Sequence, residues 1–208
     1  MAEPKSFIAD PVLAKHAASP LAGHVETGEF GALRDEGPGV VLSERFGLSI
    51  AEVAAWKGGE SKCRAAIKSA TGLTLKTAPG SGTAKPVATA FNIAPARWLV
   101  SGEESELVAK LAEEIGDNGS VVDLSHGRSV LHVDGPKSRW VLAKLFAIDF
   151  SEDVFAKGDG LATVHHDFMV QIQRTDSDAF DIYVFRSFAR SFWHSLCRSS
   201  EEVGYRVL

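Results

Sequence analysis

Residues 168–185 read FMVQIQRTDSDAFDIYVF, and this stretch decides the fold class. Apolar and polar residues alternate on both sides of the polar loop at 175–178, which is the period of a half-buried strand. The pattern therefore predicts a strand, a loop and a returning strand. An apolar stripe at helical spacing follows at Phe188, Phe192 and Leu196, and Ser187 is placed to cap this final helix.

The same succession of strands and helices extends upstream. Ser101 with Glu104 is a capping-box pattern before a helix whose stripe runs from Leu107 to Ile115, and Gly72 ends an earlier helix. Residues 73–86 are predicted to be a loop, and 121–125 with 129–133 a hairpin. This order favours an α+β fold, with mostly antiparallel sheets and helices packed on one face. Further strands are predicted at 40–43, 48–56, 87–93, 97–100 and 161–165, and a further helix at 136–146. The helix that Gly72 ends has its apolar stripe at Cys63, Ala66, Ile67 and Ala70.

Chain length and the positions of proline and glycine suggest an N-terminal arm followed by one domain. Residues 1–38 are rich in proline and glycine and are predicted to form an extended N-terminal arm, which is either loose or docked on a partner. The remaining residues, 39–208, are enough for a single α+β domain built of two lobes, at about 39–116 and 117–208.

Composition excludes several classes of protein. Apolar residues make up 45% of the 208 residues and charged residues 24%, as in ordinary globular domains. The net charge of −5 argues against nucleic-acid binding, and no apolar run is long enough to span a membrane. The N-terminus lacks the apolar core of a signal peptide, and Cys63 and Cys197 form no C-x-x-C pair. We therefore expect a cytoplasmic protein.

The sequence contains no recognisable catalytic or cofactor motif. Neither G-x-G-x-x-G, a P-loop, G-x-S-x-G nor H-E-x-x-H occurs, so we expect no cofactor, metal or catalytic residue on this chain. Asp123, Ser125 and His126 are the residue types of a nucleophilic triad, and they alone favour a hydrolase. Adjacency in sequence is not triad geometry, however, and a polar β-turn explains the segment better.

Several segments in order resemble one family, the gamma subunit of heterotetrameric sarcosine oxidase. The resemblance covers roughly residues 38–208 and depends on the order and spacing of the segments together. They are LSIAEVAAWKG (48–58), APARWLV (94–100), VDLSHGRS (122–129), VDGPK (133–137), LAKL (142–145), IDF (148–150), FAKG (155–158), FDIYVFRSFARSFW (180–193) and EVGY (202–205).

The resemblance implies a fold like the folate-binding domain of glycine-cleavage aminomethyltransferases and a place in a complex with alpha, beta and delta subunits. That complex demethylates sarcosine oxidatively to glycine, yielding hydrogen peroxide and either formaldehyde or 5,10-methylenetetrahydrofolate, with tetrahydrofolate as co-substrate. FAD, FMN and NAD are expected on the alpha and beta subunits and zinc on delta. The recurring polar positions of the family are expected to be fold or interface determinants here, and they are Asp123, Ser125, Arg128, Arg186 and Ser187.

One alternative stays open. A free-standing folate-binding or aminomethyltransferase-like protein would need a deep pocket, with a carboxylate for the pterin ring and a basic rim. The chain is short for such an enzyme, so the non-catalytic structural subunit is preferred.

Overall fold

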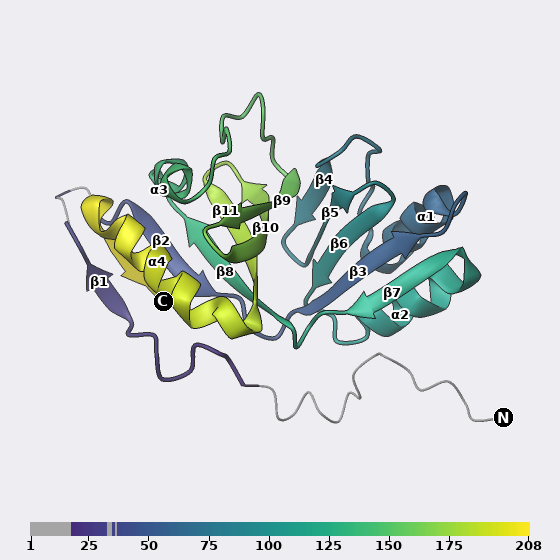
Figure 1. Ribbon diagram of the computed structural model, residues 1–208, viewed down its shortest axis with the longest axis horizontal. Coiled ribbons are helices and arrows are strands. Elements are labelled where there is room, and N and C mark those ends of the chain that lie inside the picture. The colour runs from purple at the N-terminus through teal and green to yellow at the C-terminus, as the bar shows by residue number, and fades with distance from the viewer. Residues whose placement is uncertain (1–17, 33–34, 36) are drawn as a thin grey trace.

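The computed structural model describes residues 18–32, 35 and 37–208, and the strands of this part of the chain form two sheets (Figure 1). The seven-stranded sheet has the order β1 (Gly28–Phe30), β12 (Tyr205–Val207), β2 (Val40–Glu44), β8 (Arg128–Asp134), β11 (Ala179–Phe185), β10 (Phe168–Asp176) and β9 (Gly160–His165). The five-stranded sheet has the order β4 (Gly82–Lys85), β5 (Ala88–Ala94), β6 (Arg97–Gly102), β3 (Ser49–Ala55) and β7 (Gly119–Asp123). Every pair is antiparallel except β12–β2.

Helices cover one face of each sheet, which confirms the predicted α+β class. The helices α1 (Glu60–Thr71) and α2 (Leu107–Ile115) pack on the five-stranded sheet, and α3 (Ser138–Leu145) and α4 (Ala189–Ser200) on the other. Their apolar stripes are buried as the helical spacing predicts. Short 3₁₀ turns accompany them in the described part of the chain: η2 (Gly116–Asn118), η3 (Arg186–Phe188) and η4 (Glu201–Val203).

The chain crosses between the sheets side by side at two places. The β2–β3 and β7–β8 connections both run from one sheet to the other, and the first is joined to strand β8 where the Arg45 N–H donates to the Val130 carbonyl at 2.8 Å. The predicted hairpin of 121–125 with 129–133 is therefore wrong, because β7 pairs with β3 whereas β8 pairs with β2 and β11. The lobe boundary at 116 and 117 stays a prediction, although sheet membership does not follow it.

The inner faces of the two sheets pack against each other around a third apolar cluster. It contains Leu48, Ile50, Phe91, Leu99, Val130 and Tyr183. The strand at 168–174 and its returning partner were expected to be half-buried, yet Gln173 and Asp181 on the polar side are completely buried. The second sheet covers that side, which a pattern within one strand does not reveal.

Three local predictions differ from the structure. Ser101 lies buried in β6 and caps nothing, since α2 begins at Leu107 without a side-chain cap. Ser187 lies in η3, and α4 likewise begins without a side-chain cap. Part of the predicted loop at 73–86 is strand β4, because its backbone pairs with β5.

The described part of the N-terminal arm lies on this chain itself. Leu21 is buried in the core of the seven-stranded sheet, and β1 extends that sheet by pairing with β12. The rest of the predicted arm, residues 1–17, 33–34 and 36, lies outside the described residues.

Candidate functional site

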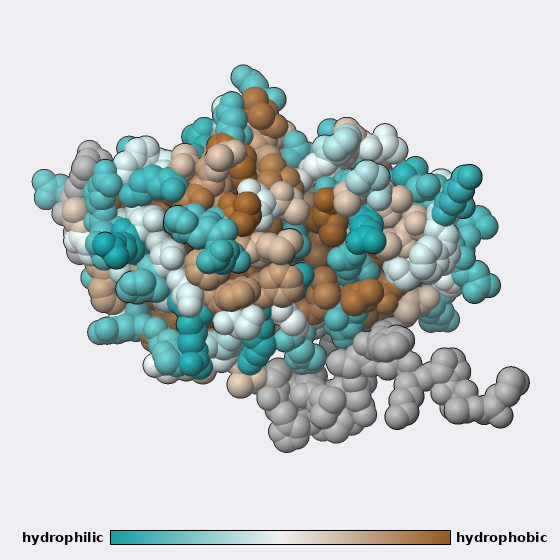
Figure 2. Space-filling model, viewed as in Figure 1, coloured by the Kyte–Doolittle hydropathy of each residue, from teal (hydrophilic) through white to brown (hydrophobic). Residues whose placement is uncertain are grey.

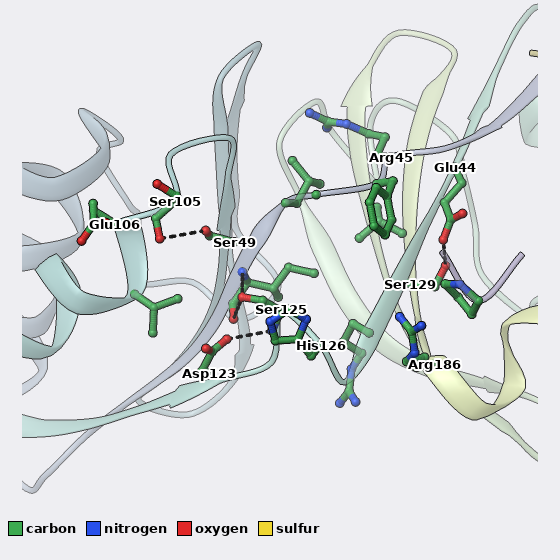
Figure 3. Close-up of a pocket in the computed structure, with 18 of the residues that line it drawn as sticks. Glu44, Arg45, Ser49, Ser105, Glu106, Asp123, Ser125, His126, Ser129 and Arg186 are labelled. Carbon is green, nitrogen blue, oxygen red and sulfur yellow. Dashed lines mark hydrogen bonds between the residues drawn. The ribbon is translucent and has the colours of Figure 1, made fainter. Parts of the chain in front are cut away.

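A pocket of about 360 Å³ opens where the two connections cross between the sheets (Figure 3). Figure 3 shows Asp123, Ser125 and His126 on one side of it and Ser129 and Arg186 on the other. Its lining comes from the β2–β3 and β7–β8 connections, the start of α2, Pro20 and Arg186. Of the predicted site residues, the pocket brings together Asp123, Ser125, Arg128 and Arg186.

Asp123 and Ser125 use their side chains to fix the β7–β8 turn. A carboxylate oxygen of Asp123 accepts the Ser125 N–H at 2.9 Å, as in an Asx-turn. The Ser125 Oγ accepts the Ile50 N–H at 2.9 Å, which ties the turn to β3. A hydroxyl held in this way organises the backbone of the turn.

His126 is exposed at the tip of the same turn. Within the described residues, the hydrogen bonds of the Ser125 hydroxyl are to the Ile50 backbone and none is to His126. A nucleophilic serine needs a base within hydrogen-bond reach. The polar-turn interpretation is therefore preferred over a triad.

Arg128 is a half-buried cation that belongs to no ion pair within the described ranges of the chain. Its guanidinium lies over the ring of Phe185, at 3.7 Å from the centroid, and its Nε is buried with no hydrogen-bond partner among the described residues. Burial lowers the pKa of Arg128, and only the more distant Glu52 carboxylate acts in the opposite direction. The guanidinium of Arg128 thus lies over the Phe185 ring, and its Nε is out of contact with water.

Arg186 joins the turn to the N-terminal segment, whereas Ser187 lies apart. The Arg186 N–H donates to the Gly127 carbonyl at 3.0 Å, and its guanidinium donates to the Ala18 carbonyl. Ser187 is exposed and lines a neighbouring hollow with Arg186 and Arg190, outside the first pocket.

The sequence analysis missed a charged cluster behind the pocket. Asp181 is completely buried and accepts from Arg45 at 2.6 Å, while its other oxygen lies 2.7 Å from the Nδ1 of His132. Nearby, the Glu44 carboxylate accepts hydrogen bonds from the hydroxyl groups of Ser19 and Ser129. The alternation of β11 places Asp181 on the inner face, but only the pairing of the two sheets shows that this face is buried.

Nowhere in residues 18–32, 35 and 37–208 do three or more His, Cys, Asp or Glu side chains gather so as to hold a metal ion. In the same part of the chain, every helix is too short or too polar to cross a bilayer.

Comparison with known families assigns the chain. The family described as "Sarcosine oxidase, gamma subunit family" matches residues 58–202, which include the pocket's β7–β8 turn and Arg186. The chain belongs to the sarcosine oxidase gamma subunit family. The resemblance predicted from the sequence is thus confirmed.

Curated relatives of the same family agree. The chain is 30% identical over 134 residues to sarcosine oxidase subunit gamma of Corynebacterium sp. (strain P-1), covering 64% of this chain and 66% of that one. It is 32% identical over 141 residues to the subunit of Arthrobacter sp, covering 65% and 68%. The matches thus span about two thirds of the curated relatives' own length.

Solved structures match a larger share of this chain than the curated relatives do. A chain of the heterotetrameric sarcosine oxidase from Corynebacterium sp. U-96 superposes with a TM-score of 0.75 at 27% identity, covering 89% of this chain and 95% of that one. The glycine cleavage system aminomethyltransferase T from Bartonella henselae superposes with a TM-score of 0.62 at 18% identity, covering 90% and 57%. The second likeness concerns the fold alone and confirms the predicted aminomethyltransferase-like architecture.

Proposed function

We propose that this chain is the gamma subunit of a heterotetrameric sarcosine oxidase and serves there as a non-catalytic structural subunit. The observation that carries the proposal is the match to a chain of that enzyme from Corynebacterium sp. U-96 over 89% of this chain and 95% of that one. A match over nearly the whole of both chains is what a shared place in an assembly would produce.

The pocket supports a structural role. Its most suggestive polar residues, Asp123 and Ser125, bind backbone N–H groups and hold the two connections together. The space between the inner faces of the sheets is filled by side chains that include Phe91 and Tyr183, whereas the folate-binding alternative needs a deep pocket. In the proposal, the predicted site residues act in folding or assembly.

The proposed complex carries out its chemistry on other subunits. It demethylates sarcosine to glycine and yields hydrogen peroxide with formaldehyde or, when tetrahydrofolate is present, 5,10-methylenetetrahydrofolate. FAD, FMN and NAD would be held by the alpha and beta subunits and zinc by delta. A cytoplasmic location is part of the same proposal, and the free thiols of Cys63 and Cys197 are compatible with a reducing compartment.

Native purification tests the proposal. A tagged copy of the chain is purified from its own host, and the eluate is analysed by mass spectrometry, flavin absorbance and sarcosine-dependent peroxide production. We expect two larger flavin-bearing subunits in fixed stoichiometry with the chain, together with peroxide formed only when sarcosine is added. A colourless chain recovered alone, binding tetrahydrofolate, would overturn the proposal in favour of the folate-binding alternative.

A further inference from the structure

Three arginines form one continuous surface beside the pocket. Arg128 begins β8 opposite Phe185, and Arg186 follows Phe185 and bonds to the β7–β8 turn. Arg190 lies one helical turn further along α4 and lines the same hollow as Arg186. We call Arg128, Arg186, Arg190 and the exposed Phe188 the arginine surface.

The arginine surface is positively charged in a chain whose net charge is −5. Residues 186–200 contain three arginines and a histidine but no aspartate or glutamate. The helix α4 crosses the front of the molecule in Figure 1, and hydrophilic residues are abundant over that region in Figure 2. The local charge is thus opposite in sign to that of the whole molecule.

Within the part of the chain that the structure describes, no ion pair neutralises this charge. Among the described residues, the ion pairs involve other arginines, such as Arg45 and Arg174, and none includes a member of the arginine surface. Arg186 and Arg190 donate to the backbone carbonyls of Ala18 and Pro20. These bonds orient the guanidinium groups but leave their charge uncompensated.

Arg128 adds a second, independent observation. Its guanidinium lies over the Phe185 ring and its buried Nε has no hydrogen-bond partner among the described residues, so no hydrogen bond there offsets the desolvation of the Nε. An arginine that is fixed against an aromatic ring loses little side-chain freedom when it binds a carboxylate through two parallel hydrogen bonds.

We propose that the arginine surface docks an acidic segment of another subunit, with carboxylates on Arg128 and Arg186 and an apolar side chain against Phe188. The inference rests on the proposed function, since it needs the chain to be part of a complex. Charge complementarity selects the occupant: a second copy of this acidic chain would bring net repulsion, and so small a basic patch is insufficient for nucleic acid.

The test compares arginine-to-methionine variants within the complex. Arg128→Met and Arg186→Met remove the charge and keep an apolar stem, and Arg190→Met is a separate third variant. Arg64→Met is the matched control, because Arg64 is also half-buried and outside every ion pair found in the described residues, but lies on α1. Each variant is co-expressed with the partner subunits, and gamma dissociation is followed by native mass spectrometry over increasing NaCl.

We expect the Arg128→Met/Arg186→Met double variant to bind the other subunits about tenfold or more weakly than wild type, with a smaller salt dependence. Arg64→Met should match wild type, and thermal unfolding of each isolated chain controls for folding. If the double variant fails to fold, the dissociation of Arg190→Met is compared with that of wild type instead.

Wild-type retention by variants that fold would overturn the inference and leave the proposed function standing. If the wild-type chain itself recovers no flavin-bearing subunit, the proposed function fails instead. A salt-sensitive dimer of the isolated chain that is lost in Arg128→Met would also overturn the inference, because a second copy would then occupy the surface.

Discussion

At the scale of single residues, Asp181 matters for stability because its charged carboxylate has no exposed surface. Burial of an unpaired charge is strongly unfavourable, and here Arg45 and His132 each provide a hydrogen bond. Burial by itself lowers the pKa of Arg45, but the charge and hydrogen bond of Asp181 raise it above its usual value. The pair thus fastens the β2–β3 connection to the centre of the large sheet.

Replacement of Asp181 by asparagine should destabilise the protein substantially. Asp181→Asn leaves Arg45 without its main counter-charge, and we expect a loss of about 2–3 kcal/mol of unfolding free energy, since Arg45 keeps some contact with water. Urea unfolding followed by circular dichroism measures the loss. Glu103→Gln is the control, because that exposed carboxylate lies 3.8 Å from Arg45 and should contribute little. Equal stability of Asp181→Asn and wild type would contradict the role given to Asp181.

At the scale of secondary-structure elements, the end of α1 depends on one backbone conformation. Gly72 follows the helix with φ 69° and ψ 10°, in the left-handed region, and its N–H donates to the Lys68 carbonyl at 2.8 Å. A side chain at this position crowds the backbone, which is why glycine is favoured there. The glycine therefore ends the helix while still satisfying one of its last carbonyls.

Alanine at this position should cost stability without changing the fold. Gly72→Ala is expected to lower the unfolding free energy by about 1 kcal/mol, because alanine strains the left-handed conformation. Gly72→Asn should lose less, since asparagine tolerates this conformation better than alanine does. Urea midpoints rank the three proteins. A Gly72→Ala protein as stable as Gly72→Asn would contradict the explanation.

Elements with local signals could be predicted from the sequence. The stripe of α1 and its glycine stop, the burial of α2 and the presence of strands at β10 and β11 all agree with the structure. The pairing of β10 with its returning strand β11 was also predicted. The partners of β7 and β8 could not be predicted, because these strands follow each other as a hairpin would but belong to different sheets. Pairing is decided by which helices cover each apolar face, and that information is distributed over the whole chain.

The candidate site shows the same division. The polar turn at Asp123 and Ser125 is visible in the sequence, because its hydrogen bonds are mostly local. The Ser101 pattern misleads, since its hydroxyl bonds to Tyr183, 82 residues away, at 2.9 Å. A pattern of neighbouring residues in the sequence does not indicate such a distant contact. The charges around Asp181 were missed for the same reason.

At the scale of the whole molecule, the two sheets depend on each other. Their inner faces share an apolar cluster, and the only route of the chain from the described start of β2 to β12 passes between the sheets at the two connections. At the centre, the Tyr183 hydroxyl meets Ser101 and Thr89, at 2.9 and 3.1 Å. Burial raises the pKa of Tyr183 well above its usual range, so the phenol keeps its proton and can donate.

Because the two sheets share an apolar cluster in addition to the core that each forms with its own helices, we expect a single unfolding transition to which Tyr183 contributes. Tyr183→Phe keeps the ring beside Phe91 and removes only the hydroxyl, while Thr89 and Ser101 still bond to each other at 3.0 Å. The loss should be about 1 kcal/mol. Tyr183→Ala also empties space between the sheets and should lose about 3–5 kcal/mol. Urea unfolding followed by both tryptophan fluorescence and circular dichroism checks this. A shared interior makes the two sheets unfold together. Two separate transitions in wild type would therefore mean that the sheets are joined by the chain connections alone. A loss of unfolding free energy in Tyr183→Ala no larger than that in Tyr183→Phe would mean the same.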